Sequence, residues 1–144
     1  MTREKVHTVE GYYDGVRSGT ADFEGQSHYF SCPFDEAIDD YADYFLLYPV
    51  SLEFMRNAFR QQAIFKAWES KFHSGLETIE THPANGGVDP EYDEAERWLE
   101  AQKKTFATAP LKRRATFHVR AGEQGPRIAG VLRELDVEWL PASD

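Results

Sequence analysis

The first third of the chain alternates short apolar and aromatic runs with turns that contain glycine. Three of these runs have the length of a β-strand: residues 7–14, Thr20–Phe23 and Ser27–Cys32. Asp14-Gly15 separates the first two runs, and this dipeptide supplies the positive φ that a tight hairpin needs. Pro33 ends the third run because proline cannot donate a hydrogen bond to a sheet. The close spacing predicts an antiparallel meander or a small barrel.

The pattern changes at Ser51 from a strand period to a helical one. Residues 44–50 are apolar on both faces, which predicts a buried fourth strand. Over residues 51–73 apolar side chains recur at steps of three and four, which predicts an amphipathic helix with Ser51 as its N-cap. Asp89-Pro90 predicts the start of a second helix, since aspartate caps helices and proline suits the first helical position. Its expected apolar positions are Tyr92, Ala95, Leu99 and Phe106.

The last third returns to a period of two and predicts a half-buried hairpin around a turn at Gly122–Pro126. The expected inward positions are Ala115, Phe117 and Val119 in one strand and Val131, Leu135, Val137 and Trp139 in the other. Arg133 also falls on the inward side, which is a weakness of this register.

Four strands, two helices and two further strands indicate the α+β class, because nothing resembles the repeated crossovers of a parallel sheet. A chain of 144 residues has the size of one domain, so residues 1–144 are expected to form a single unit. We expect an antiparallel β-sheet or small open barrel of about six strands. Both helices would be inserted between strands 4 and 5 and packed on one side.

The acidic balance of the chain limits its partners. The formal net charge is −9, which disfavours binding to nucleic-acid phosphates and to anionic membranes. A basic protein partner fits this charge better, and the alternative is that the charge only maintains solubility. One cysteine rules out an intrachain disulfide, residues 1–6 lack the apolar stretch of a signal peptide, and no apolar run could span a bilayer. These features predict a cytoplasmic location.

Motifs for common cofactors and nucleophiles are absent from the sequence. There is no Walker loop, dinucleotide-binding glycine motif, H-E-x-x-H, C-x-x-C or nucleophile elbow, so no cofactor is predicted. Cys32 lies on a predicted strand between Ser31 and Pro33, where a packed small residue is expected in preference to a nucleophile.

The N-terminal hairpins carry the first candidate binding surface. It consists of Tyr12, Tyr13, Asp14, Arg17 and His28. Adjacent tyrosines would place one ring on each face of a strand, so that one is buried and the other lies beside the polar residues. The alternative is ordinary turn chemistry with one tyrosine packed over the end of a barrel.

An acidic cluster follows at Asp35, Glu36, Asp39, Asp40 and Asp43. Its spacing is not that of an EF-hand, and we interpret it as a solvated loop or a single helical turn. Its functional alternative is a docking face that attracts a basic partner over a long range.

Glu69, His73 and His82 form a candidate metal site. Glu69 and His73 are four residues apart and share a helical face, and His82 follows across a short loop. Two histidines and a carboxylate are the minimum for an open zinc or iron site, whereas an ion pair at the helix end explains Glu69 and His73 equally well.

A resemblance extends over most of the chain. The pattern Tyr12-Tyr13-Asp14-Gly15 with Arg17 and Gly19, followed by Gly25, His28 and Phe30, resembles a group of small uncharacterised bacterial cytosolic proteins. Leu46, Pro49, Trp68 and Thr81-His82-Pro83-Ala84 are similar to the same group. The resemblance implies a bacterial cytosolic protein and carries no catalytic residue with it.

Three functions fit the sequence. The preferred hypothesis is a small acidic binding protein for a basic partner, such as an immunity or inhibitor protein. One alternative is a metal-assisted hydrolase that uses Glu69, His73 and His82. The other is an accessory subunit of a larger assembly.

Overall fold

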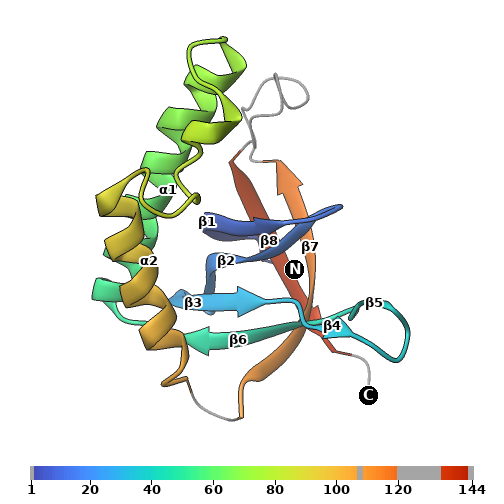
Figure 1. Ribbon diagram of the computed structural model, residues 1–144. Coiled ribbons are helices and arrows are strands. Elements are labelled where there is room, and N and C mark those ends of the chain that lie inside the picture. The colour runs from blue at the N-terminus through green and yellow to red at the C-terminus, as the bar shows by residue number, and fades with distance from the viewer. Residues whose placement is uncertain (1, 107–108, 120–133, 143–144) are drawn as a thin grey trace.

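Six antiparallel strands form a closed barrel in the computed structural model, which describes residues 2–106, 109–119 and 134–142 (Figure 1). In order around the barrel they are β1 (Glu4–Tyr12), β2 (Val16–Phe23), β3 (Gln26–Ser31), β6 (Phe45–Pro49), β7 (Leu111–Val119) and β8 (Leu135–Pro141). The barrel closes where β1 pairs with β8, with Glu4 opposite Val137 and Lys5 opposite Asp136. The α+β class and the antiparallel pairing are therefore confirmed. The predicted open sheet or open barrel is corrected, because the pairing of β1 with β8 closes the barrel.

The segment predicted to be an acidic loop contains two further strands, β4 (Phe34–Asp35) and β5 (Asp40–Tyr41). They form a separate hairpin, in which the Phe34 and Tyr41 rings pack edge to face across the strands with centroids 5.5 Å apart. Asp39 in the turn has a φ of 52°. Because of this hairpin, the helices follow β6 and precede β7, and the predicted position between strands 4 and 5 is corrected.

The helices begin at the predicted caps. The first helix is α1 (Leu52–His73), and the backbone N–H of Phe54 donates to Ser51 Oγ at 3.1 Å. The second is α2 (Pro90–Lys103), where the N–H of Tyr92 donates to Asp89 Oδ1 at 3.0 Å. A short 3₁₀ helix, η1 (Ile79–Thr81), lies between them. In Figure 1 both helices lie on the same side of the barrel, as predicted.

Strand bounds differ from the predictions at the chain's ends. The strand predicted at 7–14 runs from Glu4 to Tyr12, and the last strand begins at Leu135. The pairing of β7 with β8 and the inward side chains Phe117 and Val137 are confirmed. The inward position predicted for Val119 is corrected, because this residue ends β7 and its side chain is exposed. The turn predicted at Gly122–Pro126, together with Val131 and Arg133, lies outside the described residues.

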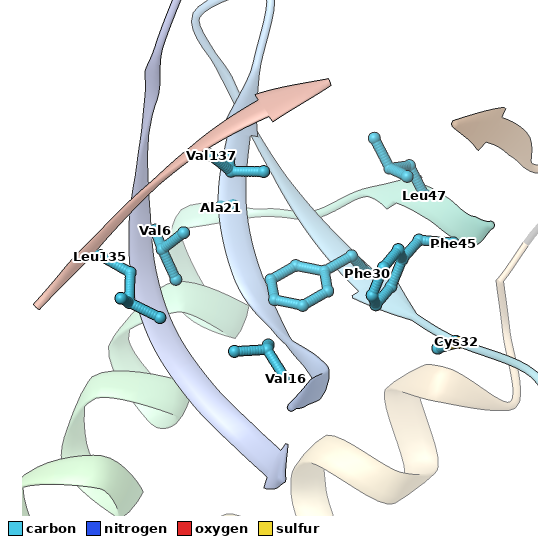
Figure 2. Packing of buried hydrophobic residues seen from close by; sticks show 9 residues of the cluster. All are labelled: Val6, Val16, Ala21, Phe30, Cys32, Phe45, Leu47, Leu135 and Val137. Carbon is cyan, nitrogen blue, oxygen red and sulfur yellow. The ribbon is translucent and has the colours of Figure 1, made fainter. Parts of the chain in front are cut away.

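Aromatic rings fill the barrel interior. Phe30 has no solvent exposure, and its ring centroid lies 5.7 to 5.9 Å from those of Phe45, Phe117 and Trp139. Nine buried side chains form this cluster (Figure 2): Val6, Val16, Ala21, Phe30, Cys32, Phe45, Leu47, Leu135 and Val137. A barrel filled in this way leaves its outer surfaces for binding.

A second apolar cluster joins the helices to the outside of the barrel. Tyr29 points away from Phe30 because successive strand residues face opposite sides, and it packs with Phe54 of α1 and Leu99 of α2. Phe106 lies beyond the end of α2, and its ring stacks on Tyr48 with centroids 4.7 Å apart. The helical layer is thus fixed to β3 and β6.

Gly19 allows β1 and β2 to approach closely, and we predict that Gly19→Ala destabilises the barrel. A Cβ atom at this position would lie 2.1 Å from the carbonyl oxygen of Thr8 and 3.1 Å from the Phe30 ring. The paired strands would have to separate, so the free energy of unfolding should fall by about 1–3 kcal/mol in urea denaturation.

Gly86→Ala is the matched control, because a Cβ atom there meets nothing within 4 Å. Its free energy of unfolding should stay within about 0.5 kcal/mol of the unmodified protein. Equal effects of the two substitutions would show that the close approach at Gly19 does not matter for stability.

Candidate functional site

The structure brings the N-terminal turn and the acidic hairpin together at one end of the barrel. The Tyr13 ring lies 6.1 Å from the Tyr41 ring, and the guanidinium of Arg17 lies 4.1 Å from the centre of the same Tyr41 ring. Arg17 also fixes the turn, since its Nε donates to the carbonyl of Tyr13 at 2.9 Å and its Nη2 to that of Asp14 at 3.3 Å. Two of the sequence's candidate features therefore form one surface.

Large apolar side chains are exposed on this surface, which we call the aromatic–acidic end. It comprises Tyr13, Asp14, Arg17, Phe34, Asp35, Glu36, Ile38, Asp39, Asp40, Tyr41 and Asp43. Tyr13 is 70% exposed, Ile38 62% and Phe34 52%. Exposed rings of this size contribute little to folding, and an exposed apolar patch edged by polar groups is typical of a docking site. In Figure 1 the β4–β5 hairpin projects away from the two helices.

The carboxylates of the hairpin are not neutralised locally. Within the described ranges, none of Asp35, Glu36, Asp39, Asp40 and Asp43 makes an ion pair. Two of them support the local backbone instead. Asp35 Oδ1 accepts from the N–H of Ala37 at 3.0 Å, and Asp40 Oδ1 accepts from its neighbour Tyr41 at 2.7 Å. The negative charge is therefore available to an incoming cation.

Two members of the predicted binding surface lie elsewhere. Tyr12 is 50% exposed and lines a cavity beside the helices, whereas His28 is buried against Phe23 and its Nδ1 bonds the carbonyl of Gln26 at 2.8 Å. The expectation that one tyrosine would be buried is also wrong. Because β1 ends at Tyr12, the strand alternation does not reach Tyr13, which lies in the turn.

The predicted metal residues do not converge. His82 packs its ring against Trp68, with centroids 4.4 Å apart, and its Nδ1 accepts a hydrogen bond from the N–H of Ala84 at 3.0 Å. Across the residues that the structure describes, which include Glu69, His73 and His82, no three histidine, cysteine or carboxylate side chains are grouped closely enough to hold a metal ion.

Cys32 lies beneath the acidic hairpin and is buried, as the sequence predicts. Its thiol donates a weak hydrogen bond to the carbonyl oxygen of Ala42, with Sγ 3.2 Å from that oxygen. Burial raises the pKa of the thiol, and this disfavours the thiolate that a nucleophile requires. Cys32 is thus a packing residue that supports the base of the hairpin.

A cavity of about 300 Å³ lies between the outer face of the β1–β2 hairpin and the helical layer. Polar residues of the barrel wall are Thr8, Glu10 and Thr20, and those of the helical side are Gln61, Gln62, His82 and Tyr92. The hydroxyls of Thr8 and Thr20 are buried and bond each other at 2.7 Å. Phe54, Phe65 and Leu99 add apolar surface. Concave sites of this mixed character are typical of small-molecule binding.

A network of charged groups borders the cavity. Lys103 Nζ bonds Glu10 at 2.8 Å and Glu100 at 2.9 Å, and it lies 4.7 Å from the centre of the Tyr29 ring. Burial lowers the pKa of Lys103, but the charges of Glu10 and Tyr29 and the hydrogen bonds to Glu10 and Glu100 together outweigh burial, so the pKa is raised. This ammonium is therefore held as an internal counterion.

Glu96 has the opposite environment. Gln61 Nε2 donates to its Oε2, yet burial raises the pKa of the Glu96 carboxyl, and the hydrogen bond only partly opposes this. Burial also raises the pKa of Tyr92 to about 12, with a further contribution from the charge of Glu96. Burial thus disfavours the charged forms of both groups on this side of the cavity.

Comparisons with known proteins give no family for this fold. No protein-family model, curated protein or solved structure matches the chain. Among the described residues, no helix has the length and apolar character needed to cross a membrane.

Sequence reasoning missed the cavity and its charged network. The contact between Lys103 and Glu10 joins residues 93 positions apart, so no local spacing in the sequence predicts it. A signal was present in Gln61 and Gln62, which are polar residues within the apolar stretch of the α1 pattern. Gln61 lies on the predicted buried face and is indeed buried.

We predict that Glu96→Gln stabilises the protein relative to the unmodified chain, and that this difference in the free energy of unfolding grows as pH rises. The folded-state pKa of Glu96 lies above its ordinary value of 4.5. The stability that the protonated carboxyl contributes is therefore fully present below pH 4.5 and is lost as pH rises through the folded-state pKa. The glutamine variant does not titrate. Its free energy of unfolding, relative to the unmodified protein, should rise between pH 4 and 7 by up to about 1 kcal/mol, since partial exposure screens the effect.

Glu94→Gln on the same helix is the control. Glu94 is exposed and lies 3.8 Å from Arg60, so its charge contributes little. A pH dependence that is the same in both variants would contradict the assigned environment of Glu96.

Proposed function

We propose that this chain is a small acidic binding protein that engages a basic protein partner through the aromatic–acidic end. The observation that carries the proposal is the contact of the Tyr13 turn with the Tyr41 hairpin, which gathers exposed rings and unpaired carboxylates at one place. An immunity or inhibitor protein that covers a basic enzyme belongs to this class.

The two kinds of side chain would contribute differently to binding. The carboxylates of the hairpin attract a cationic surface from a distance and raise the association rate. The exposed rings of Tyr13 and Phe34 would then be buried by the partner, and buried aromatic anchors mainly slow dissociation. Charge and exposed apolar area at the same end support a protein partner in preference to a small cation.

We expect neutralisation of the hairpin to slow association with a basic peptide. In the double variant Asp35→Asn/Asp39→Asn, the side-chain oxygen of residue 35 can still accept the N–H of Ala37. Asparagine also tolerates the positive φ of 52° at residue 39. Stopped-flow fluorescence with a labelled synthetic peptide of alternating arginine and leucine should show an association rate lower by roughly threefold or more at low salt.

A charge-matched double variant, Glu91→Gln/Glu94→Gln, places the same change of net charge on α2 and should leave the rate nearly unchanged. Phe34→Ala should instead increase the dissociation rate by roughly tenfold. Equal slowing by both double variants would mean that only net charge attracts the peptide, and the proposed surface would then be wrong.

A further inference from the structure

The cavity beneath the helices is separate from the aromatic–acidic end, and its polar groups share a feature that defines a ligand. Several of them have their acceptor atom occupied by the protein and retain a donor. Gln62 Oε1 accepts the backbone N–H of Val9 at 2.9 Å, so its Nε2 hydrogens remain. This amide has no other hydrogen bond to the described residues.

His82 follows the same rule, and Tyr92 adds a hydroxyl group that can donate. Ala84 donates its N–H to His82 Nδ1, so in the neutral ring the proton is on Nε2 and can be donated. Tyr92 stays protonated because its pKa is raised to about 12, and within the described part of the chain its hydroxyl has no hydrogen-bond partner. Three side chains from α1, α2 and the loop between them therefore line one cavity, and each carries a hydrogen-bond donor.

Gln61 supplies the complementary group. Its Nε2 donates to Glu96, which leaves the Oε1 of this buried side chain as an acceptor. A ligand that offers an acceptor oxygen beside a donor N–H would satisfy both kinds of group. A carboxamide has this arrangement.

The charges around the cavity disfavour ionic ligands. Glu10 is the charged side chain among the described lining residues, and Lys103 already pairs with it at 2.8 Å. An anion would meet Glu10 without gaining a free cation, and a cation would have to compete with the partly buried ammonium of Lys103 for its carboxylates. The apolar walls at Phe54, Phe65 and Leu99 suit a ring or short chain.

We propose that this cavity binds a small neutral molecule that carries a carboxamide or similar carbonyl group on an apolar ring. The two lone pairs of the carbonyl oxygen accept from the Tyr92 hydroxyl and from Gln62 or His82, and the apolar part packs against Phe54 and Leu99. The volume of about 300 Å³ is at the lower end of known ligand pockets and limits the molecule to a compact one.

Four probes of similar size test the assignment: benzamide, benzoate, benzamidinium and toluene. Titration of the ¹⁵N-labelled full chain, followed by NMR, should show saturable binding of benzamide with signal changes at Thr8, Ala58 and Tyr92. The Kd of benzamide should be at least about fivefold lower than the Kd of each of the other three probes, because only benzamide offers a neutral carbonyl.

Tyr92→Phe removes one donor and leaves the ring in place, and it should weaken benzamide binding by about fivefold. Tyr44→Phe is the control, since Tyr44 does not line the cavity, and it should leave the Kd unchanged. Failure of benzamide to bind, a preference for either ionic probe or for toluene, or equal affinities of the two phenylalanine variants would overturn the proposal.

Discussion

Phe30 packs at the centre of the barrel and organises the strands around it. Its ring touches rings from β6, β7 and β8, so strands from both ends of the chain are held around one side chain. The pairing of β1 with β8 then closes the sheet and removes its edges. Because side chains fill the interior, any ligand has to bind outside the barrel.

The neighbouring residue, Tyr29, transfers this rigidity to the helices. Alternation along β3 places Phe30 inside and Tyr29 outside, where the Tyr29 ring contacts Phe54 and Phe106. Lys103 lies over the same ring and pairs with Glu10 of β1. A single dipeptide thus couples the barrel core, the helical layer and the charged network beside the cavity.

The two proposed binding surfaces differ in whether their carboxylates are paired with cations of the protein. Beside the cavity, the ammonium of Lys103 is shared by the carboxylates of Glu10 and Glu100. At the aromatic–acidic end, the hairpin carboxylates have no ion-pair partners among the described residues. A cavity whose charged wall is already paired within the protein suits an uncharged small molecule, whereas unpaired exposed charge acts over the longer distances at which proteins meet.

The local elements can be predicted from neighbouring residues alone. Strand alternation, the helical period after Ser51, its cap, and the Asp89-Pro90 start depend on neighbouring residues, and the structure has all of them. The acidic hairpin was missed because strands of two residues carry no periodic signal. His28 was placed correctly on a strand, but its burial away from Tyr13 was not foreseen.

Which of these elements contact one another depends on the folded chain as a whole. Barrel closure, the contact of Tyr13 with Tyr41 and the pairing of Lys103 with Glu10 join segments that are distant along the chain. Such contacts depend on how the whole barrel curves and where the helices lie on it. Residue spacing encodes the faces of a strand or helix, and it does not encode which remote face will lie opposite.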